Sequence, residues 1–280
     1  IVMPLYPSSS TASSNTLEKS YVYHIDKSTG VLETYQLALV DNKDKNQDQV
    51  CQMNLETKTC VNKSIIYKTN IVATANFPPN RERIIDIASP AVNDVRSTST
   101  IALSDDSVLL KYVNNNICLV TTEAVTDNSS NAVPMLYTTL VDTVSGKVIY
   151  RSSIEGGSAP ANAALIENTI ALFYWNAKAK RSEVSSIHLY EGMIDKHGLT
   201  PLASKHSATM ANKYKEAKIF SSFLSGQPLA MQKTYIMPKA ITAVHHTITE
   251  QGIANKNLLV SLTTGQIFML DQRQISPRRP

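Results

Sequence analysis

The sequence predicts an all-β fold: a β-propeller of four-stranded blades of the WD40 or quinoprotein kind, with a ring left incomplete in these 280 residues. Three observations support this fold class. Short strand-like runs are bounded by turn residues, several hairpin turns share one pattern, and helical periodicity is nearly absent. Ser207 to Ile219 is the one helix candidate. A pair of all-β sandwiches is the alternative fold.

Composition excludes several classes of protein. A hydrophobic content of 42% with 18% charged residues is typical of a globular chain. The net charge of +4 is scattered along the chain, so it gives no basic stripe for nucleic acid. No apolar run approaches the roughly 18 residues of a spanning helix. The first residue is Ile1, without an initiator Met, so we expect a piece of a longer protein.

The chain divides into four segments by its strand signals. We expect an irregular N-terminal segment over 1–20, propeller blades over 21–192, an irregular surface segment over 193–232, and the last propeller strands over 233–280.

Three hairpin turns provide the repeat signal. Two read Asp-x-x-Ser/Thr-Gly and end at Gly30 and Gly146, while the third ends at Gly265 with Ser261 in place of the Asp. An Asp carboxylate accepts from turn N–H groups, and a Gly four residues later can take the positive φ that closes the loop. We therefore expect a structural turn role for Gly30, Gly146 and Gly265.

The spacing of these glycines matches blade-sized repeats. The intervals of about 116 and 119 residues each accommodate three units of roughly 39 residues, close to a four-stranded blade. The spacing therefore predicts regular blades.

The strongest strand signal is a hairpin near the middle of the chain. Ile170 to Trp175 is a continuous apolar run, which predicts a strand buried on both faces, with Trp175 in the core. Ser185 to Tyr190 alternates, which predicts a strand with one wet face. Between them lies a cationic turn. Its Lys178, Lys180 and Arg181 could dock an acidic partner, although a plain solvated tip explains them as well.

The usual signatures of catalysis are weak. Asp105 and Asp106 are adjacent in a turn, and His245 and His246 should point to opposite faces of a strand, so neither pair predicts a metal site. Residues 156–158, Gly-Gly-Ser, lack the Lys and helix of a phosphate loop, and no Gly-x-Ser-x-Gly elbow occurs. We expect no catalytic, cofactor-binding or metal-binding residues, and no cofactor.

Cysteines and sequons bear on the compartment. Cys51 and Cys60 flank a short polar segment and could form a disulfide, while three unlinked thiols with Cys118 are an equal reading. Two sequons, at Asn62 and Asn128, lie in polar surroundings and are candidate glycosylation sites.

The central hairpin also carries a family resemblance. Its distinctive residues are Tyr174, Trp175, Asn176, Lys178, Lys180, Arg181, Glu183, Leu189, Tyr190, Glu191 and Gly192. Near the end of the chain, residues 248–253 read Ile-Thr-Glu-Gln-Gly-Ile and residues 277–280 read Pro-Arg-Arg-Pro, preceded by Ser276 where the family usually has Asp. In these motifs the chain resembles subunit 1 of the endoplasmic reticulum (ER) membrane protein complex, most specifically over 137–192 and 235–280.

The resemblance implies a function. It indicates a non-catalytic scaffold in the ER lumen, part of an insertase for tail-anchored and multipass membrane proteins. The implied partners are the other subunits and the client proteins, with 233–280 leading toward a membrane helix outside this chain. A quinone-type propeller oxidoreductase and a generic protein-interaction propeller are the alternatives.

Overall fold

The computed structural model describes residues 3–5, 20–39, 51–53, 60–63, 67–90, 100–103, 107–125, 133–194, 222–223, 226–248 and 255–279. Within these ranges the chain forms β-strands and one short 3-10 helix, η1 (Gln272–Ile275). No helix in the described ranges is long and apolar enough to cross a membrane. The all-β prediction is confirmed.

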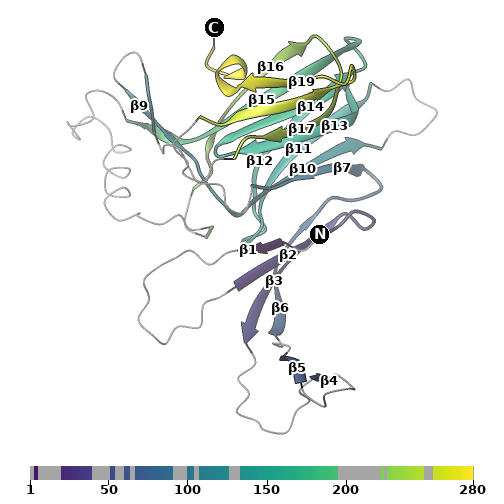
Figure 1. The fold of residues 1–280 in the computed structure, drawn as a ribbon, viewed down its shortest axis with the longest axis vertical. Coiled ribbons are helices and arrows are strands. Elements are labelled where there is room, and N and C mark those ends of the chain that lie inside the picture. The colour runs from purple at the N-terminus through teal and green to yellow at the C-terminus, as the bar shows by residue number, and fades with distance from the viewer. Residues whose placement is uncertain are drawn as a thin grey trace.

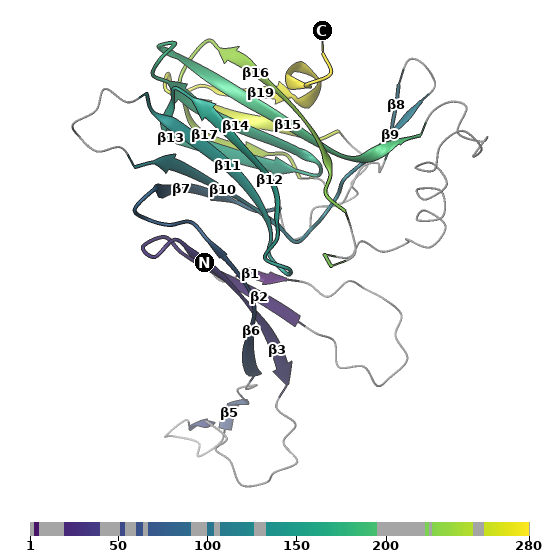
Figure 2. The same cartoon turned by 180° about the vertical axis from the view of Figure 1, so that it is seen from behind.

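Four antiparallel sheets follow one another along the chain: the first lies in the lower half of Figure 1 and the C-terminus is at its top, and Figure 2 shows them from behind. The first blade is β1 (Met3–Leu5), β2 (Ser20–Asp26), β3 (Val31–Leu39) and β6 (Tyr67–Asn76). The second is β7 (Glu82–Ala88), β10 (Ile117–Ala124), β11 (Met135–Asp142) and β12 (Val148–Glu155). The third is β13 (Gly157–Ile166), β14 (Thr169–Asn176), β15 (Arg181–Ile194) and β16 (Leu229–Met237). The fourth is β17 (Ile241–His246), β18 (Asn257–Leu262) and β19 (Ile267–Asp271).

Two short pairs of strands lie outside this plan. β4 (Cys51–Met53) pairs with β5 (Cys60–Lys63) as a separate ribbon. β8 (Thr100–Ala102) and β9 (Val108–Lys111) extend the third blade, because β9 pairs with the C-terminal part of β15.

Apolar side chains fill the space between consecutive blades, so the blades stack face to face. The core between the first two blades contains Leu32, Phe77, Cys118 and Val141. The core between the second and third contains Leu119, Leu140, Ile170 and Leu189. The core between the third and fourth contains Phe173, Val184, Leu258 and Val260.

The repeated turns have the geometry that their residues allow. Gly30 and Gly146 both have a φ of 68°, and Gly265 has a φ of 82°. The Asp26 carboxylate accepts from the Ser28 N–H, and the Gly30 N–H donates to the Asp26 carbonyl. In the third turn the Gly265 N–H donates to the Leu262 carbonyl. The acceptor lies three residues before the glycine instead of four, so this turn is of a different type.

A fourth member of this turn family carries no glycine. Asn176 to Lys180 occupies the same place between second and third strands as Asp26 to Gly30. Lys180 takes the Gly position with a φ of 53°, and the Asn176 side chain accepts from the Ala179 N–H. The sequence predicted a cationic turn here but not its likeness to the glycine turns, because Asn and Lys replace the Asp and Gly.

The regular 39-residue spacing is wrong. Gly30 and Gly146 lie in consecutive blades, and Gly265 lies two blades after Gly146. Intervals of similar length therefore span different numbers of blades, because long connections such as the one carrying β8 and β9 enlarge some of them.

Two segment boundaries also need correction. The N-terminal segment 1–20 contains β1, which pairs with β2, so it is not wholly irregular. The surface segment 193–232 is too long at both ends, because β15 continues to Ile194 and β16 begins at Leu229. Pairing with β9 and with β15 makes these ends into strands, although their own residues alternate weakly. The helix candidate 207–219 lies outside the described residues.

The glycine turns yield a matched pair of variants. A Cβ atom at Gly30 would lie 1.8 Å from the Phe77 carbonyl oxygen, whereas one at Gly265 would have nothing within 4 Å. Both glycines have positive φ, so the difference between the two variants isolates the clash. We expect Gly30→Ala to lower the free energy of unfolding by about 3 kcal/mol or more, and Gly265→Ala by about 1 kcal/mol.

Denaturant unfolding of the purified chain measures both values. Equal losses for the two variants would show that the contact between Gly30 and Phe77 does not constrain the turn.

Candidate functional site

The candidate site is the β14–β15 hairpin, and its second strand differs from the sequence expectation. Residues 182–190 of β15 are all buried, so the expected wet face is wrong. β15 is an interior strand, paired with β14 on one side and with β16 and β9 on the other. Its faces pack into the cores shared with the neighbouring blades, which buries Ser185, Ser186 and His188 despite their polarity.

One buried carboxylate organises the end of the hairpin. The Tyr174 hydroxyl and the Asn176 side-chain amide each donate to Glu183 Oε2 at 2.9 Å. The Arg181 guanidinium donates to Glu183 Oε1 at 2.6 Å. Burial alone would raise the pKa of the Glu183 carboxyl, but these hydrogen bonds outweigh it and hold the pKa below its ordinary value. Glu183 is therefore an anion that fixes three motif residues.

The turn of the hairpin rests on the β12–β13 connection. The Ala177 N–H donates to the Gly156 carbonyl at 2.7 Å, and Lys178 forms an ion pair of 2.7 Å with Glu155. A Cβ atom at Gly156 would lie 2.5 Å from the Asn176 side-chain oxygen, so only glycine allows this approach. The Gly-Gly-Ser of 156–158 thus supports the tip of the hairpin.

Trp175 does not lie in the core as expected. Its side chain is 39% exposed, while the preceding Tyr174 is buried. β14 ends at Asn176, beyond the part that both neighbouring blades cover, so the alternation of the strand turns the indole outward. The apolar run of the sequence gave no sign of where this cover stops.

The three cations of the tip have different environments. Lys178 is paired with Glu155, and Arg181 with Glu183. Lys180 is exposed and has the left-handed backbone that disfavours any residue except glycine. All three cations are exposed, and two of them already have intramolecular carboxylate partners.

A second cluster of charges lies at the opposite end of the hairpin. Glu167, in the β13–β14 turn, forms an ion pair of 2.7 Å with Lys111 and one of 3.4 Å with Lys256. The Lys256 side chain is only 2% exposed. These pairs join β9, the β13–β14 turn and the start of β18 through one buried carboxylate.

The C-terminal motif reaches this end of the hairpin. The His188 Nδ1 and the Tyr190 hydroxyl are 3.1 Å apart, and the Arg278 side chain hydrogen-bonds Tyr190. Burial lowers the pKa of His188 to about 4, with the cationic Arg278 and Lys111 adding to the shift. The two sequence motifs at 189–192 and 277–280 therefore meet in space.

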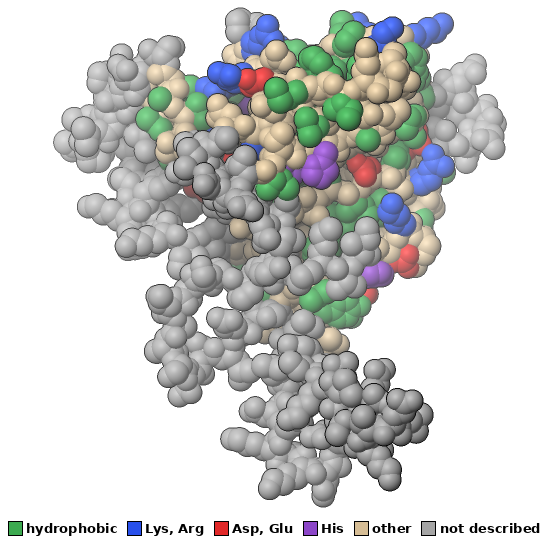
Figure 3. Space-filling model, in the orientation of Figure 1, with side chains coloured by type: hydrophobic (Ala, Val, Ile, Leu, Met, Phe, Trp, Pro, Cys, Tyr) green, Lys and Arg blue, Asp and Glu red, His purple; other side chains and the backbone are tan. Residues whose placement is uncertain are grey.

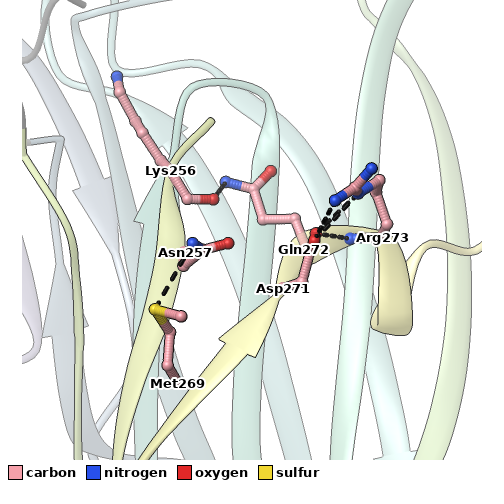
Figure 4. A network of polar contacts seen from close by, with 6 residues as sticks. All are labelled: Lys256, Asn257, Met269, Asp271, Gln272 and Arg273. Carbon is pink, nitrogen blue, oxygen red and sulfur yellow. Dashed lines mark hydrogen bonds and ion pairs between the residues drawn. The ribbon is translucent and has the colours of Figure 1, made fainter. Parts of the chain in front are cut away.

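Further contacts hold the C-terminal segment on the third blade. The Tyr235 hydroxyl donates to the Ser276 carbonyl, and the Lys233 ammonium donates to the Arg279 carbonyl, both at 2.5 Å. Figure 4 shows how η1 is joined to the fourth blade: Gln272 donates to the Lys256 carbonyl, and Asp271 pairs with Arg273.

Comparison with known families identifies the fold and its relatives. A family model described as "ER membrane protein complex subunit 1, second beta-propeller" matches residues 2–280.

The chain belongs to the family of ER membrane protein complex subunit 1. It is 30% identical over 204 residues to ER membrane protein complex subunit 1 of Xenopus laevis and of Gallus gallus, covering 73% of this chain and 19% of each relative. The Schizosaccharomyces pombe protein of the same name is 26% identical over 181 residues, covering 64% of this chain and 18% of that protein. The chain thus spans about a fifth of the length of the relatives that it matches.

Membership of the ER membrane protein complex subunit 1 family confirms the propeller prediction, since the four stacked sheets are blades of its second propeller. Among solved structures, the WD40 domain of SCAP from fission yeast matches 99% of this chain and 62% of that chain. Its sequence identity of 8% and TM-score of 0.28 are too low to support any argument.

The other candidate residues lie away from the hairpin. The rings of His245 and His246 stack with centroids 5.3 Å apart, while His246 is buried and His245 is exposed. In the described ranges, no group of three or more His, Cys, Asp or Glu is arranged to hold a metal. Asp105, Asp106 and Asn128 lie outside the described residues.

The cysteines separate into two settings. Cys118 is buried between the first two blades, and burial raises the pKa of its thiol to about 12. Cys51 and Cys60 lie on the paired strands β4 and β5, with Cys60 opposite Met53 and Cys51 opposite Lys63. Asn62 is also in β5.

His188 makes the stability of the fold depend on pH. Its folded pKa of about 4 is below the value of about 6.5 of an unfolded chain, so acid favours the unfolded state, which takes up the proton first. The contribution of the neutral His188 to the stability of the fold is complete above pH 6.5 and is lost as the pH falls toward 4. We expect the wild type to lose about 2 kcal/mol from this residue between pH 7 and pH 5.

Unfolding at the two pH values tests this expectation. His188→Gln should lose correspondingly less stability on acidification, and His24→Gln, on the exposed side of β2, is the matched control. An unchanged pH dependence in His188→Gln would contradict the burial of a neutral imidazole.

Proposed function

We propose that this chain is a non-catalytic scaffold in the ER lumen that holds other subunits of the ER membrane protein complex. Its family match supports membership of that complex. We assign it no enzymatic activity, because its motif residues make structural contacts with one another and with the C-terminal segment. Among the functions considered, the family match favours this one over a quinone-type oxidoreductase or a generic interaction propeller.

The observation that carries the proposal is the rigid tip of the β14–β15 hairpin. Glu183 fixes its base, and Gly156 and Glu155 fix its turn. This rigid support presents an exposed Trp175 and an exposed Lys180. A tryptophan on a preorganised surface is a common feature of interaction hot spots, and an adjacent cation adds electrostatic complementarity to an acidic partner.

The backbone of Lys180 supports a docking role. Asp26 to Gly30 forms the equivalent turn with glycine at this position. A lysine there costs about 1 kcal/mol of backbone strain, which a glycine would remove. We propose that Lys180, with Lys178 and Arg181 beside it, docks an acidic surface of a partner subunit.

The contacts of the C-terminal segment fit an anchoring role. Arg278 and the carbonyls of Ser276 and Arg279 bind the third blade. We propose that these contacts hold the propeller at a fixed orientation to a membrane helix that lies outside this chain. The complex as a whole would then insert tail-anchored and multipass client proteins into the ER membrane.

A charge reversal at the tip tests the docking role. In cells that express the full-length protein as their only copy, Lys180→Glu should reduce co-purification of other subunits several-fold. The level of tail-anchored proteins with moderately hydrophobic helices should fall with it. Lys27→Glu is the matched control, because Lys27 is exposed in the equivalent turn of the first blade. Normal assembly of the complex with Lys180→Glu would contradict the proposal that the tip docks a partner subunit.

Lumenal exposure predicts modification of the two sequons. We expect Asn62 or Asn128 to carry glycan, and Cys51 and Cys60 to resist alkylation until reductant is added. Glycosidase treatment of the cell-derived protein should increase its gel mobility, and Asn62→Gln with Asn128→Gln should abolish the shift. An absence of any shift, together with free thiols at Cys51 and Cys60, would place this region outside the lumen.

A further inference from the structure

The fourth blade ends in an exposed apolar edge strand. In the described residues it has three strands, whereas the sheets of the first and second blades have four each and that of the third has six. Its outer strand is β19, where Ile267 is 76% exposed, Phe268 46% and Met269 60%. Figure 3 shows hydrophobic side chains gathered on the face that carries β17–β19. Three successive exposed apolar residues on an edge strand are unusual, because edges are normally protected by charge, proline or a covering segment.

Backbone N–H and C=O groups of β19 also point toward this edge. The Leu262 N–H donates to the Gln266 carbonyl, which makes these two residues a hydrogen-bonded pair of the β18–β19 ladder. Such pairs alternate along an antiparallel ladder, and Ile267 lies opposite Ser261 in the next position. The N–H and C=O groups of Ile267 and Met269 therefore point away from β18, toward the free edge.

The side chains next to this edge lie on both faces of the sheet. Leu270 packs into the core with the third blade, and Phe268 shares its face because side chains alternate along a strand. Ile267 and Met269 lie on the opposite face. One strand added beside β19 would contact both faces and pair with the free backbone groups.

We propose that β19 is paired with an extended segment of the same polypeptide from outside residues 1–280, which completes the fourth blade as its outer strand. The segment would run antiparallel to β19 and carry apolar side chains on both faces. The inference is independent of the docking role of Lys180.

The length of the relatives supports an occupant from the same polypeptide. This chain spans 19% of the proteins that it matches, so about four fifths of their length lies elsewhere. A tethered segment binds at a high effective concentration and requires no second molecule. One strand of about five residues matches the length of β19, whereas a stable interface between two copies needs on the order of 1,000 Å² or more.

Photo-crosslinking in the full-length protein tests this proposal. With Ile267 replaced by p-benzoylphenylalanine, irradiation followed by peptide mapping should give an intramolecular crosslink to one segment outside residues 1–280. A crosslink to a second copy, to another subunit, or to a peptide within residues 1–280 would overturn the proposal, as would the absence of a crosslink.

Two backgrounds test the backbone pairing. Met269→Pro removes an N–H that points to the free edge and leaves the β18–β19 ladder its hydrogen bonds. Met269→Ala removes the same side chain but keeps the N–H. We expect the crosslink yield to fall about tenfold or more in Met269→Pro and to persist in Met269→Ala. Equal yields in the two backgrounds would overturn strand pairing.

Discussion

The burial of β15 between two neighbouring blades is the constraint on which the rest of the fold depends. This strand pairs with β14, β16 and β9, and its faces contribute to the cores on both sides. Buried polar side chains on such a strand need partners inside the protein, because water cannot reach them. The hydrogen bond of Gln232 to Ser185 and that of His188 to Tyr190 are consequences of this placement.

Buried carboxylates mark the two ends of the hairpin and join segments that are distant in sequence. Glu183 binds the turn, and Glu167 pairs with lysines from β9 and from the start of β18. Buried ion pairs contribute little net stability, since desolvation offsets the attraction. Loss of one partner, however, leaves the other charge buried and unpaired, which costs about 3–5 kcal/mol. Their effect is therefore to fix which segments pack together. The proposed scaffold role would need such a defined geometry more than additional stability.

The tip of the hairpin keeps the geometry of the repeated turn without the residues that mark that turn in the sequence. Asn176 to Lys180 has the turn geometry of Asp26 to Gly30, yet the residues that identify that turn are replaced. A pattern based on Asp and Gly finds the turns in which the backbone is unstrained. It misses the one where a lysine occupies the left-handed position, because local preference opposes that conformation. Strained positions of this kind are often found at functional sites.

Most of the strands, their hairpins and the glycine turns could be predicted from the sequence, because alternation and turn residues act over a few neighbouring positions. Family motifs at 174–192 and 277–280 were also visible in it. The exposure of Trp175, the burial of Ser185 and His188, and the contact of Arg278 with Tyr190 depend on tertiary packing. These outcomes depend on which blades cover a strand and where that cover stops. Such contacts join residues far apart in the chain, and no local pattern encodes them.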